Sequence, residues 1–91
     1  MTYIVKFAKQ ALKDIARLEI SEPKVYIKAL KIIAELREHP LFGTGKPEQL
    51  KGDRSGQWSR RLSKKHRIIY EIHDNEIVVL ILSAFGHYSD H

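Results

Sequence analysis

The sequence predicts a single α+β domain over residues 1–91, in which a small, mostly antiparallel sheet packs against a two-helix hairpin in the order β-α-α-β-β-β. Three observations predict this fold. The apolar spacing changes from that of a strand to that of a helix after Phe7. Glycine and proline then interrupt the chain between residues 40 and 56, and three strand-like runs fill most of the remainder.

The first half of the chain is typical of one strand and two helices. Residues 3–7 are rich in β-branched and aromatic side chains, which favours a strand. Over residues 8–19 the apolar side chains recur at helical spacing, which predicts a first helix. We expect Ser21 to cap a second helix, with Pro23 in its first turn and its end near His39, just before another proline. Because so few residues separate the two helices, they should form a hairpin.

The second half of the chain predicts a long loop followed by three strands. The loop covers residues 40–56, and a long loop in so small a domain is often functional. Strands are expected at residues 57–63, 66–73 and 77–85, and the turns between them are short enough for an antiparallel meander. The last run lacks the polar alternation of a half-exposed strand, so we place it centrally in the sheet, covered on both faces.

Positive charge is concentrated in one part of the chain. The net charge is +5, from 16 basic and 11 acidic residues. Eight basic and two acidic residues lie between Lys46 and Arg67, which gives this part a charge of +6 and leaves −1 for the rest. A compact cationic patch favours a polyanion such as nucleic acid as the ligand. The plain alternative is a solvated surface that binds an acidic protein.

The composition excludes several classes of protein. The chain has no cysteine, so neither a disulfide scaffold nor a thiolate zinc site is available. Its longest apolar run, residues 77–85, is too short to span a bilayer, and the N-terminal residues lack the apolar stretch of a secretory signal. We therefore expect a soluble, cytoplasmic protein that has no membrane partner.

Four motifs occur together in the second half of the chain. They are G-x-G-K-P-E-x-L-K at residues 43–51, S-G-x-W-S-R-R at residues 55–61, H-R-x-x-Y at residues 66–70 and H-Y at residues 87–88. Each motif is weak alone, but in combination the chain resembles the YoeB toxins of the wider RelE group, over nearly its whole length. The resemblance implies the RelE-like microbial ribonuclease fold.

The resemblance also implies a function. YoeB toxins are the ribonuclease halves of bacterial toxin–antitoxin pairs, so the chain is expected to be a ribosome-dependent mRNA endonuclease, or mRNA interferase, in the bacterial cytoplasm. The implied partners are messenger RNA, the ribosome and a cognate antitoxin of the YefM/Phd-like type, and members of the family often form homodimers. Two alternatives stay open, namely a ParE-like toxin that acts by binding a protein and a plain RNA-binding module.

The resemblance assigns roles to particular residues. Glu48 matches the general base, Arg67 matches the arginine that stabilises the phosphate, and His87 with Tyr88 matches the terminal acid pair. No metal or other cofactor is implied, because the RNA 2′-hydroxyl can itself attack the phosphorus. Residues 89–91 continue beyond the terminal pair, and we keep His87 as the histidine of the site. The cations expected to bind the substrate are Lys46, Lys51, Arg60 and Arg61.

Strand pairing leaves one choice open. If an odd number of residues stays unpaired in the turn, Arg61 lies opposite Arg67 and both project from one face of the sheet. A two-residue turn would instead set Arg61 opposite Ile68 and direct Arg67 to the other face. A shared site favours the first arrangement.

Two side chains near these strands have simpler expected roles. We expect Trp58 to pack in the core and His66 to be either structural or solvated.

Overall fold

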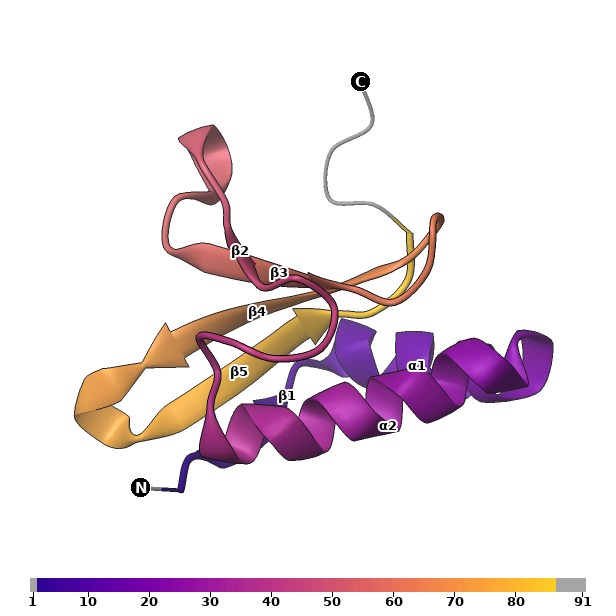
Figure 1. Ribbon diagram of the computed structural model, residues 1–91, viewed down its shortest axis with the longest axis horizontal. Helices are drawn as coiled ribbons and strands as arrows, with labels where there is room; N and C mark the ends of the chain where they lie inside the picture. The colour runs from indigo at the N-terminus through magenta and orange to yellow at the C-terminus, as the bar shows by residue number, and fades with distance from the viewer. Residues whose placement is uncertain (1, 87–91) are drawn as a thin grey trace.

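The computed structural model describes residues 2–86 and confirms the predicted α+β fold. One short strand precedes two helices, and the remaining strands follow a long loop (Figure 1). The elements are β1 (Ile4–Phe7), α1 (Lys9–Ser21), α2 (Pro23–Glu38), β2 (Glu48–Gln49), β3 (Gln57–Arg61), β4 (Arg67–His73) and β5 (Val78–Ser83). Two single-turn 3₁₀ helices, Gly52–Arg54 and Asp74–Glu76, lie in the connections.

The five strands form one sheet in the order β1-β5-β4-β3-β2. β5 is parallel to β1 and antiparallel to β4, and the pairs β4–β3 and β3–β2 are also antiparallel. β5 therefore lies in the interior of the sheet, as its continuous apolar run predicts. The predicted cover on both faces is wrong, because both helices lie on one face (Figure 1) and Leu80 and Leu82 of β5 are only half-buried. The sequence does not predict β2, because two polar residues inside a glycine-rich loop carry no strand pattern.

Both helices cover the same face of the sheet and enclose the hydrophobic core with it (Figure 1). Leu18 of α1 and Leu36 of α2 are fully buried in one cluster with Ile68, Tyr70 and Ile81 of the sheet. Complete burial of such an aliphatic side chain stabilises a fold by about 1.5–3 kcal/mol. Because side chains alternate along a strand, the chain neighbours of these core residues point to the opposite face of the sheet.

The two helices meet with a single residue between them. Glu22 ends α1 and begins α2, and its backbone N–H donates to the carbonyl of Leu18 at 2.8 Å. Ser21 does not cap α2 as predicted, because the junction is so short that Ser21 still belongs to α1. Its hydroxyl donates instead to the carbonyl of Arg17 at 2.8 Å. Pro23 begins α2 as expected, since its missing N–H has no helical partner to lose there.

β4 and β5 change register by one residue near the ends that carry the predicted site. Tyr70 pairs with Ile81, whereas Ile69 pairs with Ser83, so Leu82 is an extra residue in β5. Such a bulge bends its strand and re-aims the residues that follow it. β5, Val78–Ser83, is shorter than the predicted strand at residues 77–85.

Within residues 2–86, no helix is both long enough and apolar enough to cross a membrane.

Candidate active site

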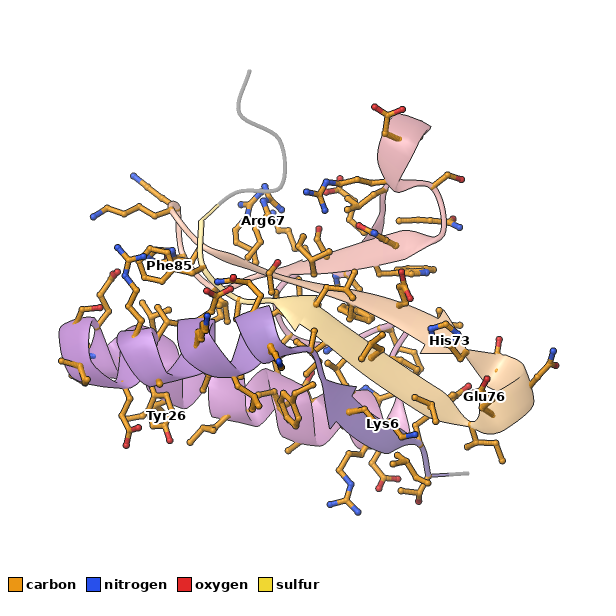
Figure 2. All side chains as sticks on the ribbon, turned by 180° about the vertical axis from the view of Figure 1, so that it is seen from behind. Lys6, Tyr26, Arg67, His73, Glu76 and Phe85 are labelled. Atoms are coloured by element: carbon orange, nitrogen blue, oxygen red, sulfur yellow. The ribbon has the colours of Figure 1, made fainter. Side chains whose placement is uncertain are left out.

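Arg61 and Arg67 lie directly opposite each other at neighbouring ends of β3 and β4. The turn between them leaves an odd number of residues unpaired, so the shared-face arrangement is the one that the chain adopts. Their chain neighbours Arg60 and Ile68 are buried on the helix side, and Arg61 and Arg67 therefore project from the open face. Figure 2 shows Arg67 on the side of the sheet away from both helices.

Glu48 joins the same face from β2. It pairs with Ser59, which lies two residues before Arg61 in β3, so the side chains of Glu48 and Arg61 share a face. Oε1 of Glu48 lies 3.9 Å from Nη1 of Arg67. This distance allows electrostatic attraction but exceeds that of a direct hydrogen bond. The Glu48 side chain is 60% exposed and that of Arg67 only 15%, so the carboxylate is the more open of the two to a ligand.

Two lysines flank Glu48 in the chain. Lys46 lies just before β2 and Lys51 just after it, and both residues are exposed, as is Arg61. The structure therefore brings Glu48, Arg61 and Arg67 to one face and leaves the two lysines accessible on the loop that supplies Glu48. We call Glu48, Arg61 and Arg67 the Glu48–Arg67 site.

Arg60 does not belong to this site, contrary to the substrate-binding role predicted for it. It is fully buried, and its Nη1 forms an ion pair with Oε1 of Glu35 at 2.7 Å. Nη2 donates to the carbonyls of His39 at 2.7 Å and Phe42 at 2.9 Å, and Nε donates to the hydroxyl of Tyr70 at 3.3 Å. The reason is strand alternation, which directs Arg60 into the core beside the outward-facing Arg61. Its donors are occupied by the protein itself.

The buried Arg60 fixes the loop that leads to Glu48. The carboxylate of Glu35 also accepts from the backbone N–H and the hydroxyl of Thr44, at 2.8 and 2.6 Å. One residue further, the carbonyl of Gly45 accepts from the backbone N–H of Arg61 at 2.6 Å. Gly45 has φ +88°, and a Cβ there would lie 2.7 Å from the carbonyl oxygen of Arg61. Only glycine fits this close approach, which anchors the loop three residues before Glu48.

Two opposing effects set the pKa of Glu35. Burial alone would raise the pKa, because it disfavours the charged carboxylate. The hydrogen bonds from the hydroxyl and amide of Thr44, together with the hydrogen bond and charge of Arg60, outweigh burial and hold the pKa of Glu35 below its ordinary value. Glu35 is therefore an ionised structural partner of Arg60.

The predicted acid pair, His87 and Tyr88, lies outside the described residues. The described chain ends at Gly86, whose carbonyl accepts from the backbone N–H of Arg67 at 3.0 Å. The peptide that precedes His87 is therefore hydrogen-bonded to the residue that carries the guanidinium of the site.

Two neighbours of the site have structural positions. Trp58 is half-buried against the core opposite Tyr70, in agreement with the predicted packing. His66 was expected to be either structural or solvated, and it is structural. Its contacts are more specific than the sequence predicts. Its ring nitrogens lie within hydrogen-bond distance of the Glu22 carboxylate and the Gly86 amide. Its place immediately before Arg67 in the H-R-x-x-Y motif is the one signal for this role.

Within residues 2–86, no group of three or more histidine, aspartate and glutamate side chains is arranged to hold a metal ion. The groups that the Glu48–Arg67 site offers are a carboxylate that can accept a proton and guanidinium groups that can pair with a phosphate. The fold and this site define a class, namely small α+β domains that present a carboxylate beside cations on the open face of the sheet.

The sequence places the chain in one family of that class. The profile of the YoeB-like toxins of bacterial type II toxin–antitoxin systems matches residues 7–88. The Toxin YoeB of Streptomyces coelicolor is 38% identical over 84 residues, which cover 92% of this chain and 98% of that protein. This chain therefore belongs to the YoeB-like toxins of bacterial type II toxin–antitoxin systems, and the predicted resemblance is confirmed.

Two solved structures share the fold across almost the whole chain. The YoeB dimer from Staphylococcus aureus is 31% identical, with a TM-score of 0.81 over 97% of this chain and 100% of that chain. YoeB in the heterotetrameric YoeB–YefM toxin–antitoxin complex from Staphylococcus aureus is 30% identical, with a TM-score of 0.79 and the same coverage.

Proposed function

We propose that this toxin is a ribosome-dependent mRNA endonuclease, an mRNA interferase that stops translation by cutting messages. The observation that carries the proposal is the Glu48–Arg67 pair, in which an exposed carboxylate lies 3.9 Å from a guanidinium on the open sheet face. RNA cleavage through the 2′-hydroxyl requires a proton acceptor and a cation beside the same phosphate. The cationic loop and strands around this pair are suited to a polyanionic substrate.

The proposed reaction proceeds by internal transfer at phosphorus. Glu48 accepts the proton of the 2′-hydroxyl as that oxygen forms a bond to phosphorus, and the bond from phosphorus to the 5′-oxygen breaks. His87 and Tyr88 are the proposed source of the proton that the departing 5′-oxygen takes up. The products are a 2′,3′-cyclic phosphate and a free 5′-hydroxyl.

In this proposal Arg67 stabilises the negative charge that develops on the phosphate. Its guanidinium pairs with the non-bridging oxygens, on which negative charge grows as the phosphorus becomes five-coordinate. A positioned general acid or base contributes about 10²- to 10⁴-fold to a rate, and a preorganised charge contact about 10²- to 10³-fold. We assign the binding of flanking phosphates to Lys46, Lys51 and Arg61, which are exposed and carry no role in the core.

The proposal includes two protein partners. A cognate antitoxin of the YefM type would cover the cationic site, as suggested by the YoeB–YefM complex of the Staphylococcus aureus relative. A homodimer is proposed on the same basis, from the YoeB dimer of that species. Because the substrate is a ribosome-bound message, the toxin would act in the bacterial cytoplasm.

Mapping of RNA 5′ ends after brief induction of the toxin tests the proposal. We expect new ends within translated messages at codons in the aminoacyl site, and their loss in Glu48→Gln. The matched control is Glu76→Gln, an exposed glutamate at the far end of the sheet (Figure 2). Growth arrest with intact messages would contradict the nuclease and favour a toxin that binds a protein or RNA without cutting.

A further inference from the structure

Residues 84–86, the last described residues before His87, each contact other parts of the fold. The backbone N–H of Ala84 donates to Oδ2 of the buried Asp14 at 2.9 Å. The ring of Phe85 lies with its centroid 3.8 Å from the guanidinium carbon of Arg17 and 4.2 Å from the centroid of the His66 ring. These contacts come from α1 and from the turn between β3 and β4, so the segment is fixed to both layers of the fold.

Gly86 is held on both sides by two consecutive residues. Its N–H donates to Nδ1 of His66 at 2.9 Å, and its carbonyl accepts from the backbone N–H of Arg67 at 3.0 Å. Gly86 has φ +80°, a conformation that glycine adopts at little cost. The peptide entering residue 87 is therefore oriented by the residues on which the guanidinium of the site is built.

The two hydrogen bonds of His66 define its tautomer. Nδ1 accepts the Gly86 N–H, so Nδ1 carries no proton, and the ring proton resides on Nε2. Nε2 lies 2.6 Å from Oε2 of Glu22 and donates to that carboxylate. The His66 side chain is only 3% exposed, so its ring is shielded from water, whereas the Glu22 side chain is 31% exposed. Glu22, the residue between the two helices, thus fixes which nitrogen of His66 faces Gly86.

We propose that His66 is a positioning residue of the nuclease site. It fixes the Gly86 peptide beside Arg67 through the bond from Gly86 N–H to its Nδ1, at the point from which the chain continues to the proposed acid pair His87 and Tyr88. This inference rests on the proposed function. His66 does not touch the substrate; it acts through Gly86, and Glu22 holds its ring in the tautomer that can accept. A misplacement of about 1 Å in a catalytic group can lower a rate by about 10²-fold, so a lost anchor at Gly86 should affect turnover.

Two conservative substitutions separate this role from simple packing. In His66→Asn the amide oxygen occupies the place of Nδ1 and can accept from Gly86, while the contact to Glu22 is lost. In His66→Gln the amide group reaches the place of Nε2 and can bond Glu22, while the acceptor for Gly86 is lost. A purely structural histidine would make the two variants similar, or would favour Gln, which retains the longer side chain.

The experiment measures single-turnover cleavage of a ribosome-bound message. We expect His66→Gln to lower the maximal single-turnover rate by about 30-fold, with the half-saturating concentration within about twofold, and His66→Asn to lose less than about fivefold of that rate. Equal losses in the two variants, or a greater loss in His66→Asn, would overturn the positioning role. An inactive wild-type toxin would contradict the proposed function instead.

A second measurement does not depend on activity. In the wild-type toxin, ¹⁵N shifts of the His66 ring should report a proton on Nε2, and the Gly86 amide should exchange slowly with solvent. His66→Asn should retain this protection, and His66→Gln should lose it while its thermal unfolding remains cooperative. A fast-exchanging Gly86 amide or a proton on Nδ1 in the wild type would contradict the proposal even if one variant failed to fold.

Discussion

Arg60 and Arg61 are consecutive residues of β3, yet one is fully buried and the other is exposed. The guanidinium of Arg60 binds Glu35 and the carbonyls of the loop after α2, whereas Arg61 faces Arg67 on the open side of the sheet. One arginine therefore supports the loop that carries Glu48, and the next is exposed on the open face of the sheet.

The first prediction concerns stability and compares these two arginines. Arg60→Leu should lower the free energy of unfolding by about 3–5 kcal/mol, because it leaves Glu35 and several loop carbonyls without their donor. Arg61→Leu, the matched control in the same strand, should change it by less than about 0.5 kcal/mol. Urea unfolding followed by circular dichroism measures both values. Similar losses in the two variants would show that Arg60 has no special structural role.

The second prediction concerns pH and Glu35. Because its pKa is lower in the folded than in the unfolded chain, the unfolded chain takes up the proton first as pH falls. The stability from Glu35 is therefore present above its ordinary value of 4.5 and is lost as pH falls through the lowered value. In Glu35→Gln the free energy of unfolding should fall less steeply with decreasing pH in this window. An unchanged slope would contradict this assignment.

The third prediction concerns the proposed base. Glu48→Gln keeps the size of the side chain but cannot accept the 2′-hydroxyl proton, so cleavage of ribosome-bound message should fall by about 10²- to 10⁴-fold. Stability should change little, because the side chain is 60% exposed. Glu76→Gln should cleave at the wild-type rate. Cleavage by Glu48→Gln at that same rate would remove Glu48 from the mechanism.

The fourth prediction concerns phosphate binding by the exposed lysines. Lys51→Ala should weaken binding of a short single-stranded RNA and lower the magnitude of the slope of log K against log salt by about 0.7. Lys6→Ala, which removes an exposed lysine of β1 away from Arg67, should leave the slope unchanged (Figure 2). Binding titrations at several salt concentrations give both slopes. Equal reductions of the slope in the two variants would indicate that a lysine contributes to RNA binding wherever it lies on the surface.

Hydrophobic periodicity was sufficient to predict the helices, the three later strands and the interior position of β5. Register was not predictable, because it depends on the unpaired residues between Arg61 and Arg67 and on the extra residue Leu82 in β5. Neither feature has a composition of its own. The pairing could be stated from sequence only as two alternatives, one of which the structure adopts.

Two residues, Arg60 and Ser21, have roles other than those predicted, each for a physical reason. As one of the cations of the basic patch, Arg60 is expected to bind the substrate, but it is buried, and its partner Glu35 lies 25 residues away on α2. Ser21 has the composition of a cap, but the helix junction is too short for it to act as one. In both cases a long-range contact or a local geometric limit overrides the residue preference.

A message with a single 2′-deoxynucleotide at the cleavage position tests the central claim most directly. If the 2′-hydroxyl is the nucleophile, the ribosome-bound deoxy message should stay intact at that bond, and the all-ribose message should give a 2′,3′-cyclic phosphate and a 5′-hydroxyl, identified by mass spectrometry. Cleavage of the deoxy message at the same bond and rate would contradict attack by the RNA itself, and with it the role assigned to Glu48 beside Arg67.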